Sequence, residues 1–157
     1  MTLAEKILQE AVAKGLTITT AESCTGGMVA AAITDIAGSS AIFERGFVTY
    51  SNLAKQDMLA VRMQTLESFG AVSEPVAQEM ALGARNAAHA DIAVAISGIA
   101  GPGGSEFKPE GRVCFATVTA TDSFVETIEY GAPGRSEVRA AARDHALSLI
   151  LKAIQAA

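Results

Sequence analysis

The sequence predicts an α/β protein in which a mixed sheet of five or slightly more strands lies between two layers of helices. Segments of strand composition alternate with helical segments along the 157 residues, which is the pattern of a three-layer α/β/α sandwich. Residues 91–96 are almost wholly apolar, as expected for a central strand covered on both faces. Residues 113–118 and 124–130 follow one another closely enough to form a C-terminal hairpin within the sheet.

A capping box and a glycine stop bound the first predicted helix. Thr2 and Glu5 have the required spacing, apolar residues then recur at helical intervals, and Gly15 ends the pattern. Residues 16–20 form a short β-branched run that predicts the first strand, and residues 46–50 predict the second.

Short helices are expected around the second strand. The segment 25–27 opens an Ala-rich helix that extends to about residue 36. Two or three short helices follow Asn52, with breaks near Val61 and at Gly70.

Two longer helices are predicted further along the chain. Pro75 begins the first, and residues 136–156 form the second, after a hairpin turn at 120–123. The expected inward faces consist of Val76, Met80, Ala84 and Ala87 in the first helix, and of Val138, Ala142, Ala146, Leu149, Ile150 and Ala153 in the second.

Bulk properties exclude several classes of protein. The length fits one domain over residues 1–157. A net charge of -5 without any basic cluster argues against nucleic-acid binding, and no apolar run reaches the roughly 18 residues needed to cross a membrane. The sequence begins without a signal-peptide pattern and has only two cysteines, Cys24 and Cys114, so we expect a cytoplasmic protein with reduced thiols.

Two segments are expected to meet in one crevice. Residues 21–27 and the Gly-rich loop 97–104 each follow a predicted strand. In open α/β sheets, ligands bind beyond the carboxyl ends of the strands. The sequence therefore predicts a ligand site between these two segments.

Ser23 is the candidate nucleophile of this site. It lies between a strand and a helix, where unpaired N–H groups and the helix dipole favour developing negative charge. By local pattern alone, the simpler interpretation is that Ser23 or Thr25 caps the helix and that Gly26 and Gly27 allow close packing.

A nucleophilic serine needs a base, and the histidines are poorly placed to be one. His89 ends a predicted helix and His145 lies within another. Lys55 is the alternative, provided that burial lowers its pKa from about 10.4 toward about 7 to 8. Tyr50 is placed to relay the proton. Taken singly, each also fits an ordinary structural role.

Other polar groups complete the candidate site. The loop 97–104 offers backbone N–H groups for an oxyanion or a phosphate, and Arg135 and Arg139 are placed to bind a phosphate at the start of the last helix. Cys24 is a rival nucleophile that lacks a histidine partner. Glu22 is interpreted as an orienting or capping carboxylate. Neither a metal nor a cofactor is expected, because no ligand cluster has the spacing for one.

Four motifs together resemble a known family. They are Ala21–Gly27, Gly46–Asn52 with Lys55, Gly70–Glu74 and Ser97–Pro102, and they occur in the order found in the C-terminal domain of competence/damage-inducible protein CinA. The entry to the last helix, Gly134–Arg139, fits as well, so the resemblance covers the whole chain. Ser97 stands where the family often has threonine, which keeps the hydroxyl.

This resemblance implies a nicotinamide-nucleotide amidase, which converts nicotinamide mononucleotide to nicotinate mononucleotide and ammonia. It further implies Ser23 as nucleophile, Lys55 as general base and Tyr50 as helper. The implied substrate cradle consists of Thr25, Gly26, Gly27, Ser97, Gly98, Ile99, Ala100 and Gly101, with Arg135 or Arg139 near the phosphate.

Two alternatives remain at this point. The same loops suit a non-catalytic module that binds a nucleotide or sugar phosphate, with Lys55 permanently charged. The family name also suggests an interaction protein in competence or damage responses. The expected partner is a small-molecule nucleotide, and a homodimer is the default assembly.

Overall fold

Five strands form one mixed sheet in the computed structural model, which describes residues 1–157. The strand order is β2-β1-β3-β4-β5, with β1 parallel to β2 and β3, and with β3, β4 and β5 antiparallel in succession. The strands are β1 (Ile18–Glu22), β2 (Phe47–Val48), β3 (Ile92–Gly98), β4 (Arg112–Val118) and β5 (Ser123–Glu129). The predicted mixed five-stranded sheet with a C-terminal hairpin is confirmed.

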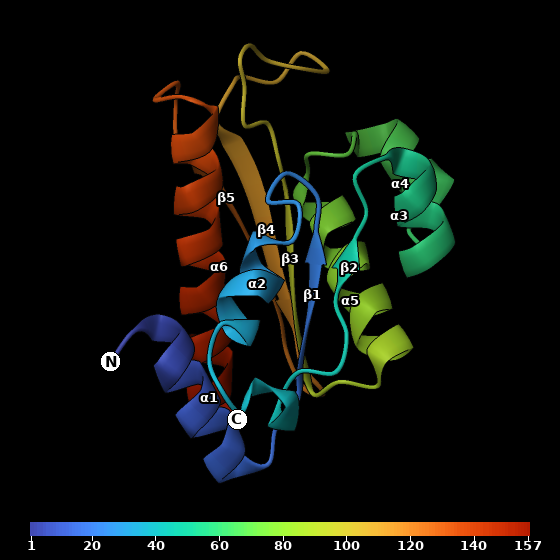
Figure 1. The fold of residues 1–157 in the computed structure, drawn as a ribbon. Helices are drawn as coiled ribbons and strands as arrows, with labels where there is room; N and C mark the ends of the chain where they lie inside the picture. The colour runs from blue at the N-terminus through green and yellow to red at the C-terminus, as the bar shows by residue number, and fades with distance from the viewer.

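Helices cover both faces of this sheet, so the predicted three-layer arrangement is also confirmed (Figure 1). On one face lie α1 (Leu3–Lys14), α2 (Met28–Thr34) and α6 (Arg135–Ala156), and on the other lie α3 (Asn52–Leu59), α4 (Met63–Phe69) and α5 (Glu74–Ala88). A short 3-10 helix, Ser39–Ala41, follows α2. No helix combines the length and apolar character that a membrane crossing requires.

The central strand β3 divides its side chains between two cores. Ile92, Val94 and Ile96 pack against α1, α2 and α6, while Ala93 and Ala95 face α5. This division follows from the two-residue period of a strand. The alanines leave room for α5 to lie close to the sheet, which explains the continuous apolar run seen in the sequence.

Local signals located the helix ends well. Thr2 and Glu5 form the expected capping box, and Gly15 ends α1 in the left-handed conformation with φ 66°. The breaks near Val61 and at Gly70 separate α3, α4 and α5 as expected. One residue was placed wrongly, since Ala87 is exposed because the buried face of α5 ends at Ala84.

Strand bounds depart further from expectation. The first strand is shifted by two residues and runs to Glu22, because all five of its residues pair with β3, from Ile18 opposite Ile92 to Glu22 opposite Ile96. The expected strand at 46–50 shrinks to two residues that pair only with the end of β1. The helix expected from residues 25–27 begins at Met28. Strand β3 includes Ser97 and Gly98, which pair with β4.

Candidate active site

The carboxyl ends of β1 and β3 lie side by side and open into one cavity, as the crevice prediction requires. Ser23 follows β1 directly, and its N–H donates to the carbonyl of Ile96 at 2.9 Å. The cavity measures about 300 Å³. Its walls consist of Ser23, Cys24, Tyr50, Lys55, Ala71, Val72, Arg135 and the loop from Ser97 to Glu106.

Lys55 lies next to Ser23, although it comes from the layer of α3, α4 and α5. It lies on α3, and its Nζ is 3.0 Å from the Ser23 Oγ and 2.7 Å from the carbonyl oxygen of Thr49. The lysine side chain is only 1% exposed and has no carboxylate partner. Ser51 caps α3 by accepting from the N–H of Ala54, so the helix that carries Lys55 starts at a defined residue.

Burial makes Lys55 a usable base. Desolvation lowers the pKa of its ammonium from 10.5 to about 8, although Cys24 and Glu106 act in the opposite direction. A lysine with this pKa is partly neutral near neutral pH, and its lone pair can then accept the proton of the Ser23 hydroxyl. The geometry is therefore that of a serine held by a buried lysine.

Cys24 lacks the environment of a reactive thiol. Its side chain is buried, and desolvation raises the pKa of the thiol to about 11, which outweighs the lowering by Arg139 and Lys55. A thiolate is the reactive form of cysteine, so little of it forms at neutral pH. The structure favours Ser23 over Cys24 as the nucleophile.

The side chain of Glu22 caps the N-terminus of α2 inside the protein. Its fully buried carboxylate accepts hydrogen bonds from the Thr25 hydroxyl at 2.7 Å and from the N–H groups of Gly27, Val29 and Ala30 at 3.2, 3.0 and 3.0 Å. The expected capping role of Glu22 is confirmed. Because this carboxylate already satisfies the helix N-terminus, the helix offers little attraction to a ligand anion.

The segment Thr25–Gly27 accordingly stands apart from the cavity. Thr25 is fully buried against Glu22, and neither it nor Gly26 nor Gly27 lines the cavity wall. The structure thus departs from the expected cradle at these three residues. The physical reason is that the carboxylate of Glu22 already accepts from the donors of this segment. The sequence shows that Glu22 precedes Ser23, but it does not show which N–H groups the carboxylate binds.

The other half of the expected cradle does line the cavity. Residues Ser97 to Gly101 form one wall, with the Ser97 hydroxyl donating to the carbonyl of Ala71 at 2.7 Å. The N–H groups of Ala100, Gly101 and Gly104 have no acceptor in the protein. Free, closely spaced N–H groups of this kind can bind an oxyanion or a phosphate.

The two arginines have different positions. Arg135 lines the cavity, where it donates to the Gly101 carbonyl at 2.8 Å and to the Tyr50 hydroxyl at 2.9 Å. Arg139 instead braces the turn after β1 by donating to the carbonyl of Cys24 at 3.0 Å. Of the pair, only Arg135 is placed to meet a ligand. Tyr50 makes no hydrogen bond with Ser23 or Lys55.

Several residues of the site gave no separate signal in the sequence. The carbonyl of Thr49 holds Lys55, but a backbone carbonyl is present at every position. Ala71 and Val72 belong to the Gly70–Glu74 motif, from which no role could be predicted for them. Ser105 and Glu106 also line the wall, and their place in the Gly-rich loop was the only available hint.

No cluster of three histidine, cysteine, aspartate or glutamate side chains could hold a metal ion. His89 ends α5 with φ 52°, and His145 pairs with Glu126 on the outer strand. Neither histidine lines the cavity.

Comparison with known proteins identifies the family. The profile of the CinA C-terminal domain matches residues 1–154. This chain belongs to the CinA C-terminal domain family. The nicotinamide-nucleotide amidohydrolase PncC of Escherichia coli K12 is 58% identical over 151 residues, which cover 96% of this chain and 92% of that relative.

Further CinA relatives agree in sequence and fold. A putative competence-damage inducible protein of Caldicellulosiruptor saccharolyticus is 44% identical over 98% of this chain, which spans only 37% of that longer relative. The crystal structure of competence/damage inducible protein CihA from Agrobacterium tumefaciens superposes with a TM-score of 0.93 at 49% identity, covering 98% of this chain and 93% of that one.

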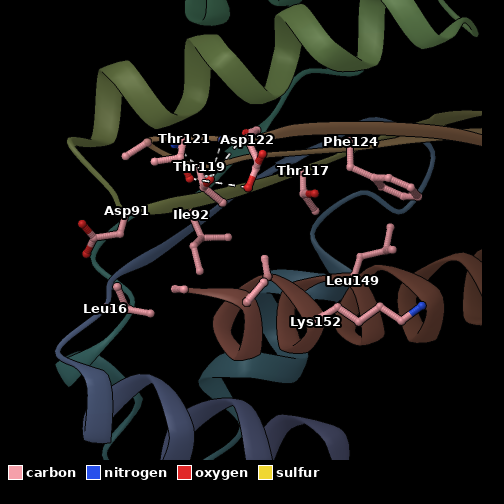
Figure 2. A pocket seen from close by; sticks show the side chains of 14 residues that line it. Leu16, Asp91, Ile92, Thr117, Thr119, Thr121, Asp122, Phe124, Leu149 and Lys152 are labelled. Atoms are coloured by element: carbon pink, nitrogen blue, oxygen red, sulfur yellow. Dashed lines mark hydrogen bonds between the residues drawn. The ribbon is translucent and has the colours of Figure 1, made fainter.

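A second cavity, of about 520 Å³, lies at the opposite end of the strands of this CinA-type sheet, where β1 and β3 begin (Figure 2). Leu149 of α6 points toward Phe124 across it, and Lys152 and residues of the β4–β5 turn also line it. The hydroxyl of Thr119 accepts from N–H groups within that turn. This cavity is larger, but it contains no serine paired with a base.

Proposed function

We propose that this protein hydrolyses the carboxamide of nicotinamide mononucleotide to give nicotinate mononucleotide and ammonia. The 3.0 Å contact between Ser23 Oγ and the buried Lys55 Nζ carries the proposal. It is supported by the 58% identity to a nicotinamide-nucleotide amidohydrolase over nearly the whole of both chains.

In the proposed mechanism, neutral Lys55 takes the hydroxyl proton as Ser23 Oγ bonds to the carboxamide carbon. The C–N bond then breaks, and the proton on Lys55 passes to the departing nitrogen, which leaves as ammonia. Water attacks the resulting ester with Lys55 again accepting a proton, which frees the acid and restores Ser23. No metal takes part.

Backbone amides stabilise the oxyanion in this mechanism. The N–H of Cys24 follows the nucleophile directly and donates to no backbone carbonyl, and Ala100 and Gly101 face the same cavity with free N–H groups. Preorganised donors of this kind lower the barrier because they need no reorientation as charge develops.

The phosphate is assigned to the Arg135 side of the cavity. Arg135 is exposed and lines the cavity, whereas Arg139 does not line it and donates to the backbone carbonyls of Cys24 and Thr25. Tyr50 is bound to Arg135, so we assign it to positioning this guanidinium rather than to direct proton transfer from Ser23.

The decisive experiment is an ammonia-release assay with nicotinamide mononucleotide, nicotinamide, nicotinamide riboside and glutamine. We expect turnover of the mononucleotide and its loss, by a factor of about 10³ or more, in Ser23→Ala. Ser148→Ala, which removes a hydroxyl from α6 away from the cavity, serves as the matched control for the fold. Wild-type turnover by Ser23→Ala would disprove the nucleophile, and binding without ammonia release would indicate a non-catalytic module.

We place this reaction in the cytoplasm, in a homodimer whose protomers each use residues 1–157 as one domain. The two buried cysteines are free thiols, as is usual for proteins of reducing compartments. Light scattering of the purified protein tests the dimer.

A further inference from the structure

The proposed substrate carries two opposite charges at its two ends. A nicotinamide ring bonded to ribose through its nitrogen is a pyridinium cation, and the phosphate is an anion. Three charged side chains line the cavity, namely Lys55, Glu106 and Arg135. Lys55 is engaged with Ser23, so Glu106 and Arg135 remain to meet the two charged ends.

Glu106 lies in a tight turn of the loop between β3 and β4. Ser105 and Lys108 exchange backbone hydrogen bonds across this turn, and Glu106 and Phe107 both have positive φ, 53° and 64°. The ammonium of Lys108 donates to the carbonyls of Phe69 and Val72. These contacts pin the turn onto the connection between α4 and α5.

The carboxylate of Glu106 has no partner within the protein. It accepts no hydrogen bond and forms no ion pair, although it lies against the backbone of Gly70 near Lys108. The other acid of the loop, Glu110, accepts from the N–H of Gly103 and does not line the cavity. Glu106 is thus the one carboxylate that lines the cavity, and it forms no hydrogen bond or ion pair with the protein.

Glu106 shares the cavity with the two groups of the proposed reaction. It lines the same walls as Ser23 and Lys55, and its charge raises the pKa of Lys55 against the larger lowering by burial. The pyridinium ring is bonded directly to the carboxamide carbon that Ser23 attacks. The ring must therefore lie near Ser23 and Lys55, in the cavity that Glu106 lines, while the phosphate is assigned to Arg135.

We propose that Glu106 determines specificity by providing the counter-charge for the cationic ring of the substrate. This inference rests on the proposed function and refines it. The carboxylate and the Arg135 guanidinium then form a charge pattern that matches pyridinium at one end and phosphate at the other. Amides on neutral rings lack this attraction, as does a mononucleotide whose ring has been reduced.

The test compares two ligands of nearly equal shape that differ in ring charge. Nicotinamide mononucleotide and its dihydro form, whose ring is neutral, are titrated calorimetrically into Ser23→Ala, which does not consume them. The same titrations are made with Ser23→Ala/Glu106→Gln. We expect the second substitution to weaken binding of the oxidised form about 10-fold or more and to change the reduced form less than about 2-fold.

Ser23→Ala/Glu67→Gln is the matched control, because Glu67 is an exposed residue of α4 without a hydrogen bond or ion pair. Equal weakening of both ligands by Glu106→Gln would overturn the proposal and indicate a contact with ribose. An unchanged affinity for the oxidised form would overturn it too. Ammonia release by the wild-type protein is measured in parallel, so the proposed function stands or falls separately.

Discussion

At the scale of single residues, Lys55 has the environment that most directly decides the chemistry. An ammonium group without a carboxylate partner is costly to bury, and the protein lowers this cost by hydrogen bonds to Thr49 and Ser23 rather than by an ion pair. The remaining cost appears as the lowered pKa, about 8. The burial of Lys55 is thus both a cost to the folded protein and the cause of a pKa that suits a general base.

The pH dependence of the reaction follows from this shift. In the proposed mechanism neutral Lys55 is the active form, so kcat/KM should rise about tenfold per pH unit below about pH 8 and level off above it. Initial rates of ammonia release between pH 6 and 10 provide the measurement. A profile that is flat across pH 7 to 9 would mean that Lys55 is not the titrating base.

At the scale of elements, α2 depends on the internal carboxylate of Glu22. Four donors at the start of this short helix share that one side chain. The helix ends at Thr34 after only seven residues, which is too short for a helix to be stable by itself.

We therefore expect Glu22→Ala to reduce the free energy of unfolding by about 2 to 4 kcal/mol, because it leaves buried N–H groups unsatisfied. Glu22→Gln should lose less, since its amide oxygen can still accept. Thr2→Ala, which removes the exposed capping box of α1, is the comparison and should cost about 1 kcal/mol. Urea unfolding measures all three, and equal losses for Glu22→Ala and Thr2→Ala would contradict this account.

At the scale of the whole molecule, the layer of α3, α4 and α5 positions Lys55, the proposed base, next to Ser23, the proposed nucleophile. Ser23 follows β1, whereas Lys55 comes from α3, which packs mainly on α5. Gly83 allows α5 to lie close to the end of α3, because a Cβ there would run into the carbonyl of Leu59. The spacing of these two helices therefore controls the position of Lys55.

Gly83→Ala tests this coupling between layers. The added methyl group has to push α3 away from α5, so we expect a loss of about 1 to 3 kcal/mol in unfolding free energy and a fall in kcat of about 10-fold or more. Leu82→Ala, a change at the exposed neighbouring position, should alter neither strongly. The prediction fails if Gly83→Ala keeps the wild-type kcat.

Much of the fold could be predicted because its signals are local. The capping box at Thr2 and the stop at Gly15 act through neighbours in the chain, and the composition of residues 91–96 is by itself that of a covered strand; all three appear in the structure. Strand bounds were less predictable, since β1 extends to Glu22 only because β3 offers partners for each of its residues. Pairing of this kind depends on chain segments more than 70 residues apart.

By itself, the sequence determined the α/β class, most helix limits and the set of residues from which a site could be made. Only the tertiary structure decided which of them meet. It brought Lys55 within 3.0 Å of Ser23, turned Glu22 inward and left Glu106 facing the cavity. The reason is physical, because burial, pKa and the satisfaction of N–H groups depend on which surfaces pack together, and packing joins residues that are distant in sequence.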